Sequence, residues 1–172
     1  LRALVRSSAR DQSLRALGAE IIVVDYRQPE TLRHAVSGAE VAVHLAGALL
    51  PRRGETWRQA NVEVTRAVVD AAAAAGVKTC VYLSFPGADP VSKNQYLGSK
   101  GMAEAIIQQA GFAGAILRLP MILGPESPAV VQLRQMARIP LLPLVGGGMV
   151  RLQPIAEVDV LAAIAWAIAV AP

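Results

Sequence analysis

The chain has 172 residues and a formal net charge of +4; 53% of its residues are hydrophobic and only 4% are aromatic. Its arginines are scattered among few aromatics, which indicates a solvated surface rather than a nucleic-acid-binding face. No apolar run reaches the roughly 20 residues that cross a bilayer, so we expect no transmembrane segment. The single cysteine, Cys80, lies in an apolar run, which excludes an internal disulfide and favours a reduced, cytoplasmic setting. No His, Cys or carboxylate pair has metal-ligand spacing, so we expect no metal site.

Short apolar runs alternate with amphipathic stretches along the chain. This alternation predicts an α/β fold in which helices cover both faces of a parallel sheet. We predict strands at residues 1–6, 20–25, 41–45, 79–84 and 115–119. We predict helices at residues 9–17, 29–38, 55–75, 96–110 and 130–137, and a last helix from about residue 158. No internal repeat and no long linker divides the chain, which indicates one domain.

The segment from Tyr96 to Lys100 places a phenol and an ammonium four residues apart in a predicted helix. One helical turn puts both side chains on the same, inward-facing side. An ammonium beside a phenol lowers the pKa of the phenol, which suits a general acid/base that moves a hydroxyl proton. The alternative is a half-buried tyrosine beside a lysine whose stem covers apolar surface while its head reaches water.

Further segments occur in a fixed order around this pair. They are Val43-His44-Leu45-Ala46-Gly47, Asn61-Val62-Glu63-Val64-Thr65, Val81-Tyr82-Leu83-Ser84, Leu117-Arg118 and Gly124-Pro125. With Tyr96 to Lys100, this series resembles the short-chain dehydrogenase/reductase superfamily, and its extended and atypical branches most closely. The segments 143–148 and 153–160 are similar to atypical members, which include epimerase-like proteins and relatives of the nucleotide-binding accessory subunit of respiratory complex I.

The resemblance implies a doubly wound, Rossmann-like parallel sheet that binds a nicotinamide cofactor and a small-molecule substrate. Asp25 and Tyr26 would then border the adenine of the cofactor. Ala46 and Gly47 would let the backbone approach the cofactor closely. Lys100 would bind the nicotinamide ribose.

The sequence begins at what resembles the second strand of this family. The family's first strand, its Gly-rich turn and the helix that holds the cofactor pyrophosphate have no counterpart here. In the strand order 3-2-1-4-5-6, that first strand lies between the second and the fourth. We therefore expect residues 1–172 to form an incomplete domain of a longer protein that is truncated at both ends.

The end of the first predicted strand bears on the choice of cofactor. It reads Arg6-Ser7-Ser8, with Arg10 close behind and no carboxylate before Asp11. Family members that prefer NAD place an acidic residue here, whereas an arginine accommodates the 2′-phosphate of NADP. We expect Arg6, Ser7 and Arg10 to bind that phosphate, so that NADP(H) is preferred over NAD(H). The alternative is a surface turn in which Ser8 caps the next helix.

In many extended members of the family, two or three small hydroxyl residues follow the strand that ends here at Ser84, and the middle or last of them binds the substrate carbonyl. Ser84 serves in that role only if the catalytic position is not one of the next two residues. Phe85 and Pro86 follow it, and neither side chain can donate a hydrogen bond. Two hypotheses therefore stay open. The first is an NADP(H)-dependent oxidoreductase or epimerase in which Ser84, Tyr96 and Lys100 serve hydride transfer. The second is a non-catalytic NADPH-binding scaffold, redox sensor or complex-assembly subunit.

Three smaller expectations complete the interpretation. Asn61 could position a water or a backbone group, or could be ordinary helix surface, and both alternatives stay open. His44 is expected to pack in the core. Small residues along the helices 55–75 and 95–110 would let these helices pair across a two-fold axis, which predicts a homodimer or a place in a larger complex.

Overall fold

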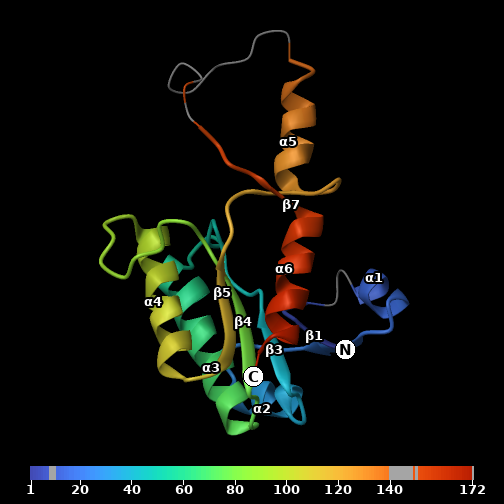
Figure 1. The fold of residues 1–172 in the computed structure, drawn as a ribbon, viewed down its shortest axis with the longest axis vertical. Helices are drawn as coiled ribbons and strands as arrows, with labels where there is room; N and C mark the ends of the chain where they lie inside the picture. Colours follow the sequence, from blue (N-terminus) through green and yellow to red (C-terminus); the bar gives the residue numbers. More distant parts are fainter. Residues whose placement is uncertain (8–10, 140–148, 150, 172) are drawn as a thin grey trace.

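The computed structural model describes residues 1–7, 11–139, 149 and 151–171. Strands and helices alternate through most of this length, as the hydrophobic pattern predicts (Figure 1). In chain order the elements are β1 (Arg2–Val5), α1 (Asp11–Ala16), β2 (Glu20–Val23), α2 (Pro29–Val36), β3 (Val41–His44), the π-helical segment η2 (Arg58–Glu63), α3 (Val64–Ala74), β4 (Thr79–Ser84), α4 (Gln95–Gln109), β5 (Ala113–Arg118), β6 (Ile122–Leu123), α5 (Pro128–Met136), β7 (Ile155–Ala156) and α6 (Glu157–Ala169).

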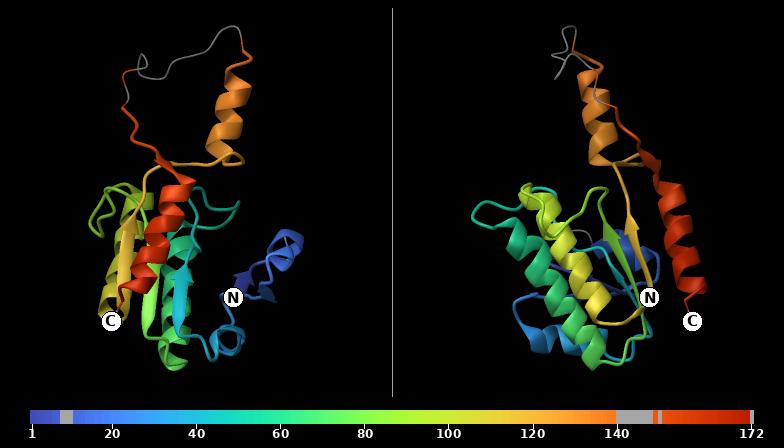
Figure 2. Two further views of the ribbon diagram at one scale, coloured as in Figure 1. Left: turned by 45° about the vertical axis from the view of Figure 1, so that its right-hand side comes forward. Right: turned by 60° about the vertical axis from the view of Figure 1, so that its left-hand side comes forward.

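Every strand pair in the described residues is parallel. β3, β4 and β5 form a three-stranded sheet in that order, and β1 pairs with β2 as a second sheet. In Figure 2, α3 and α4 lie on one side of the three-stranded sheet and α6 lies on the other. The predicted α/β class, with parallel strands covered by helices on both faces, is confirmed.

The core consists of two apolar clusters under these helices. One cluster joins β4 to η2, α3 and α4 through Val62, Val69, Cys80, Tyr82, Ala103, Ile106 and Ile107. The other joins β2 and α2 to α3 through Val24, Leu32, Ala35, Val36 and Ala71. The helix α3 contributes to both clusters, so it links the two sheets.

The helix expected from about residue 55 to 75 begins at Trp57, the first residue of its apolar stripe. Thr56 and Gln59 form a reciprocal cap, since the Thr56 N–H donates to Gln59 Oε1 at 2.9 Å and the Gln59 N–H donates to Thr56 Oγ1 at 3.2 Å. This capping box starts the helix at Trp57 and leaves Glu55 in the preceding loop. The next turns are wound as the π-helical η2, which sequence periodicity does not reveal.

A short pair of strands beyond the sheet was not expected. β6 and β7 pair in parallel over two residues each, with Ile122 opposite Ile155 and Leu123 opposite Ala156. They connect the end of β5 to α6, and α5 stands beyond them, away from the helical layers (Figure 1). Two-residue strands are too short to show a period of two in the sequence.

Candidate functional site

Tyr96 lies in the first turn of α4. The Asn94 side chain caps this helix, because its Oδ1 accepts hydrogen bonds from the backbone N–H groups of Tyr96 at 3.0 Å and Leu97 at 3.2 Å. The ring of Tyr96 is half-buried and packs edge-on against Phe85, with 5.4 Å between the ring centroids. The residue after Ser84 therefore supports Tyr96 by packing instead of offering a hydroxyl.

Lys100 points into the protein, and only 6% of it is exposed. Its Nζ donates hydrogen bonds to the hydroxyl of Tyr82 and to the backbone carbonyl of Leu83, both at 2.7 Å. Burial lowers the pKa of Lys100 to about 8, and the nearby Glu104 carboxylate acts in the opposite direction. The ammonium thus lies at the carboxyl end of β4, next to Ser84.

The expected effect of Lys100 on Tyr96 was wrong for this structure. The pKa of Tyr96 is raised by burial instead of being lowered. The reason is that the Lys100 ammonium donates to Tyr82, which lies on the strand beneath α4. The two residues share a helix face, yet the Lys100 ammonium is bonded to Tyr82 and Leu83.

Ser84 ends β4 with a buried side chain, of which 6% is exposed. Its backbone carbonyl accepts a hydrogen bond from the Leu119 N–H at 3.1 Å. Among the described residues, no group is hydrogen-bonded to its Oγ. A buried hydroxyl without a partner is costly in a native protein and marks a place where a ligand can supply the hydrogen bond.

Asn61 is buried, with 1% exposed, so it is not ordinary helix surface. Its Oδ1 accepts from the Ala48 N–H at 2.8 Å, and its Nδ2 donates to the Ala48 carbonyl at 3.2 Å and to Ser99 Oγ at 2.9 Å. Asn61 thereby ties the loop after β3 to η2 and α4. Ala46 and Gly47 lie in that loop, directly before Ala48.

Gly47 lets the loop after β3 pack against Asn61, close to the Lys100 ammonium. Its φ is +154°, which side chains rarely adopt, and a Cβ there would lie 2.8 Å from Asn61 Oδ1 and 4.0 Å from Lys100 Nζ. The close approach therefore requires a glycine. The carboxyl ends of the neighbouring strands β3 and β4 thus carry three features: the buried Lys100 ammonium, the unpartnered Ser84 hydroxyl and the backbone of Gly47.

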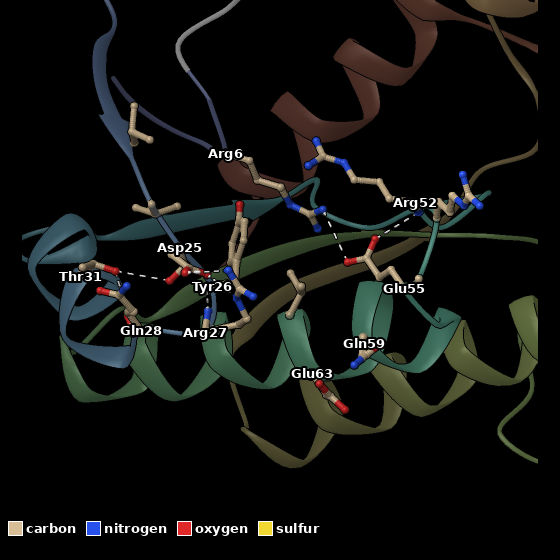
Figure 3. Close-up of a pocket in the computed structure, with 15 residues that line it drawn as sticks. Arg6, Asp25, Tyr26, Arg27, Gln28, Thr31, Arg52, Glu55, Gln59 and Glu63 are labelled. Carbon is tan, nitrogen blue, oxygen red and sulfur yellow. Dashed lines mark hydrogen bonds and ion pairs between the residues drawn. The ribbon is translucent and has the colours of Figure 1, made fainter.

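A pocket of about 860 Å³ lies between the ends of β1 and β2 and the loop before η2 (Figure 3), and Gly47, Ser84, Tyr96 and Lys100 are not among the residues that line it. Arg6 reaches across it, with Nη1 3.9 Å from Glu55 Oε1 and its guanidinium carbon 5.4 Å from the centre of the Tyr26 ring. Burial raises the pKa of Tyr26, and the charge of Arg6 opposes this. Hydrogen bonds from Arg27 lower the pKa of Asp25, so that this carboxylate is ionised at neutral pH.

The structure brings together only some of the expected cofactor-binding residues. Arg6, Asp25 and Tyr26 line one pocket, as does the basic loop that contains Arg52 and Arg53. Ser7 is exposed at the end of β1. Arg10, whose guanidinium was expected to meet the same phosphate as Arg6, lies outside the described residues.

The sequence did not predict the contacts among His44, Thr65 and Tyr82, which are buried next to Lys100. The His44 ring stacks on the Tyr82 ring at 5.2 Å and 20°, and His44 Nε2 lies 2.9 Å from Thr65 Oγ1. Burial lowers the pKa of His44 to about 4, and the Lys100 charge adds to this. His44 packs in the core as expected, but its contact with Tyr82 was missed. One feature of the sequence indicates that Tyr82 lies near the site: it is two residues before Ser84 and therefore on the same face of β4.

Residues 1–158 match the family of NAD(P)H-binding proteins. The chain belongs to this family. The ceramide reductase of Caulobacter vibrioides is 33% identical to it over 83% of the chain and 45% of the relative. A mitochondrial protein of Arabidopsis thaliana, NADH dehydrogenase [ubiquinone] 1 alpha subcomplex subunit 9, is 27% identical over 84% of the chain and 36% of the relative. The resemblance to extended and atypical short-chain dehydrogenases/reductases is thereby confirmed.

Solved structures agree with this assignment. The NADPH-dependent quinone oxidoreductase of Escherichia coli, solved with NADPH, superimposes with a TM-score of 0.59 and 27% identity over 70% of the chain and 40% of that protein. The dTDP-glucose 4,6-dehydratase of Streptomyces venezuelae, solved with NAD, superimposes with a TM-score of 0.82 over 98% of the chain and 62% of that protein, and its 20% identity shows the fold alone. The chain spans about half the length of the curated relatives it matches.

Two further observations, on membrane spans and on metal sites, concern the residues that the structure describes. No helix among them has the length and hydropathy to cross a membrane. No three His, Cys, Asp or Glu side chains in this part of the chain are grouped so that they could hold a metal ion.

Proposed function

We propose that the protein is an NADP(H)-dependent oxidoreductase or epimerase of the atypical short-chain dehydrogenase type that acts on a small-molecule substrate. The bound nicotinamide supplies or accepts a hydride at its C4. Tyr96 moves the hydroxyl proton of the substrate as general acid/base, and Ser84 donates a hydrogen bond to the substrate oxygen. Lys100 binds the nicotinamide ribose and places a positive charge next to the reacting oxygen.

One observation carries this proposal: the end of β4 holds both a buried, unpartnered hydroxyl and the carbonyl to which a buried ammonium is bonded. Lys100 Nζ is bonded to the carbonyl of Leu83, and Ser84 follows directly with no partner for its Oγ among the described residues. If these groups served stability alone, the buried hydroxyl would be expected to have a hydrogen-bond partner. The half-buried Tyr96, one helical turn before Lys100, supplies the third group.

The preference for NADP(H) rests on the pocket at the end of β1. Arg6 presents its guanidinium there, and Asp25 is already engaged by Arg27 through hydrogen bonds of 3.0 and 3.1 Å. A 2′-phosphate would compete with Glu55 for Arg6, since their separation of 3.9 Å is long for a charge-assisted hydrogen bond. By the same resemblance, Tyr26 borders the adenine, and Ser7 and Arg10 belong to the phosphate site.

A non-catalytic role is the second candidate, because Phe85 and Pro86 follow Ser84 where the family often has further hydroxyls. In this case NADPH would stabilise a scaffold, a redox sensor or a subunit of a larger complex. The relative in the NADH dehydrogenase complex supports such a role. A homodimer through α3 and α4 is also part of the proposal, although Gly98 and Gly101 of α4 already face the chain's own loop at Ser92 and at Asp89. We propose a cytoplasmic location.

Replacement of Tyr96 by Phe separates the two functions. The variant keeps the ring against Phe85 and loses one hydroxyl, so folding and NADPH binding should persist. Turnover of a carbonyl substrate, followed as NADPH oxidation, should fall by a factor on the order of 10² to 10⁴. Gln95→Ala, an exposed change in the same helical turn, is the matched control and should leave turnover unchanged.

In a scaffold, Tyr96→Phe would leave every measured property as it was. Cofactor removal would then act only through stability and would lower the melting temperature, since a ligand that binds the native state stabilises it by mass action. Full turnover in Tyr96→Phe would rule out the acid/base role.

A further inference from the structure

Tyr82 of β4 contacts the Lys100 ammonium, although the proposed reaction does not use it. We propose that Tyr82 is a positioning residue, which fixes the ammonium of Lys100 at the carboxyl end of β4 so that it faces the space beside Gly47. That this ammonium serves a bound cofactor rests on the proposed function. The claim that Tyr82 holds the ammonium in this place is independent of the proposed function.

The contact geometry is that of a fixed cation. Lys100 Nζ lies 2.7 Å from the Tyr82 hydroxyl and 2.7 Å from the Leu83 carbonyl, and 4.3 Å from the centre of the Tyr82 ring. A lysine side chain is long and flexible, so a single acceptor leaves its end mobile. Two acceptors on neighbouring residues of one strand fix both its position and its direction. An ammonium has three donors, and the third remains for a ligand.

Tyr82 can fix its partner because it is itself immobile. Its exposed fraction is 0%, and its ring belongs to the core cluster that joins β4 to α3 and α4. The His44 ring covers one of its faces at 5.2 Å, and His44 is in turn held by Thr65. The phenol oxygen therefore has a defined place at the end of a rigid stack.

The charges around Lys100 favour this role. Burial raises the pKa of Tyr82 and lowers that of His44 to about 4, so both groups on the sheet side are neutral at neutral pH. Glu104, on the same helix as Lys100, is bound by Arg118 of β5 through hydrogen bonds of 3.0 and 2.7 Å. The ammonium is thus held by neutral dipoles, and the carboxylate nearest to it already has a cation.

The loop after β3 passes close to the ammonium. A side chain at residue 47 would come within 4.0 Å of Lys100 Nζ, and Gly47 has none. The Asn61 amide holds the next residue, Ala48, by both its N–H and its carbonyl. Tyr82 thus fixes the cation on the sheet side, and the Gly47 backbone lies on its other side.

A titration of Lys100 in the full-length protein tests the proposal. The ¹³C signal of its ε-carbon, assigned by its loss in Lys100→Arg, should titrate near the wild-type pKa of about 8. Tyr82→Phe keeps the ring and the stack on His44 but removes the acceptor oxygen. Since a hydrogen bond to the charged form raises a lysine pKa, the midpoint should fall by about one pH unit.

Cys80→Ala is the matched control, because Cys80 is buried on the same face of β4 and does not touch the ammonium. It should leave the Lys100 midpoint in place. An unchanged midpoint in folded Tyr82→Phe would overturn the proposal, and so would an equal change in Cys80→Ala. If Tyr82→Phe does not fold, the wild type decides: a nuclear Overhauser contact between the Lys100 ε-protons and the Tyr82 ring supports the proposal, and its absence overturns it.

A binding profile separates this inference from the proposed function. If Lys100 binds the cofactor, NADPH affinity falls as pH rises through the Lys100 pKa, and in Tyr82→Phe this fall begins at a lower pH. A changed ε-carbon midpoint with a flat affinity profile would keep Tyr82 as the positioning residue and refute the cofactor role of Lys100. An unchanged midpoint with a pH-dependent affinity would do the reverse.

Discussion

Arg6 is held by weak contacts on both sides. Its ion pair with Glu55 is 3.9 Å long, and its guanidinium lies 5.4 Å from the Tyr26 ring. Its side chain is 30% exposed, so neither contact is deeply buried. A contact of this kind contributes little to stability. An arginine that is ordered but weakly paired can exchange its partner for a phosphate.

Arg6→Gln should therefore weaken NADPH binding with little effect on NADH. A charge-assisted hydrogen bond to a phosphate is worth about 1.5–3 kcal/mol, which corresponds to a loss of roughly 10- to 100-fold in NADPH affinity. Fluorescence titration of the wild type and the variant with both nucleotides measures the difference. Arg33→Gln, an exposed change in α2 whose ion pair is with Glu30, is the control.

Equal wild-type affinity for the two nucleotides, or tighter binding of NADH, would remove the assignment of Arg6 to a 2′-phosphate. Loss of both nucleotides in Arg6→Gln would instead point to a general role in the shape of the pocket.

At the scale of single residues, spacing in a helix predicts which face two side chains share. It does not predict where their ends go. Tyr96 and Lys100 were placed on one inward face, and Lys100 is indeed buried. The partner of Lys100 is nevertheless Tyr82, because the stem of a lysine reaches past its own helix to the strand beneath. That contact depends on how α4 packs on β4, which no local pattern contains.

At the scale of elements, η2 decides how the loop after β3 is held. Its π winding carries Asn61 into the interior, where three hydrogen bonds tie it to Ala48 and Ser99. π-helical turns are rare and often occur at functional sites. Here the turn joins the loop that carries Ala46 and Gly47 to the helix that carries Lys100.

Asn61→Ala should destabilise the protein by about 2–3 kcal/mol, because the Ala48 N–H and carbonyl lose their partner in a part-buried place. Urea unfolding measures this change. Arg66→Ala, at an exposed position of α3, is the control and should change stability by no more than about 0.5 kcal/mol.

If Asn61→Ala is as stable as the wild type, the loop after β3 does not depend on this amide. A reduced NADPH affinity at unchanged stability would mean that Asn61 serves the cofactor more than the fold.

Periodicity predicted the type and order of most elements, since strand and helix patterns differ clearly over six or more residues. It placed the start of the helix that contains η2 only to within two residues, because a side-chain cap sets that start. Thr56 and Gln59 cap the helix that was expected from about residue 55. Their spacing of three residues is that of a capping box, a signal that hydrophobic periodicity does not include. The π winding of η2 has no sequence pattern of its own.

At the scale of the whole molecule, the parallel sheet is interrupted. In the part of the chain that the structure describes, β1 pairs only with β2, and β3 pairs on one side with β4. Val41 and Val43 of β3 are each 37% exposed, and Leu45, directly after the strand, is 64% exposed. Unpaired strand edges of this kind expose backbone donors and acceptors. We propose that one further parallel strand lies between β1 and β3, as the family's strand order implies.

Hydrogen exchange in the full-length protein should show this strand. The amides on the edge of β1 that faces away from β2, and on the edge of β3 that faces away from β4, should exchange slowly, because a ladder bond protects each of them. The amides of β4, which is paired on both sides, provide the internal reference. Exchange on these edges as fast as in exposed loops would exclude the intervening strand.

The order of the three-stranded sheet also has a consequence for how the molecule forms. β3, β4 and β5 are neighbours in space in the same order as in the chain. The buried groups His44, Asn61, Tyr82 and Lys100, and the exposed Arg118 that binds Glu104, all lie within this one continuous stretch. The paired residues are far apart in the sequence, as Val41 is from Thr79 and Thr79 from Ala113, so each pairing must wait until the crossover segment between its strands has been made. During synthesis on the ribosome, the candidate site can therefore assemble once β5 has emerged, before α5 and α6 exist.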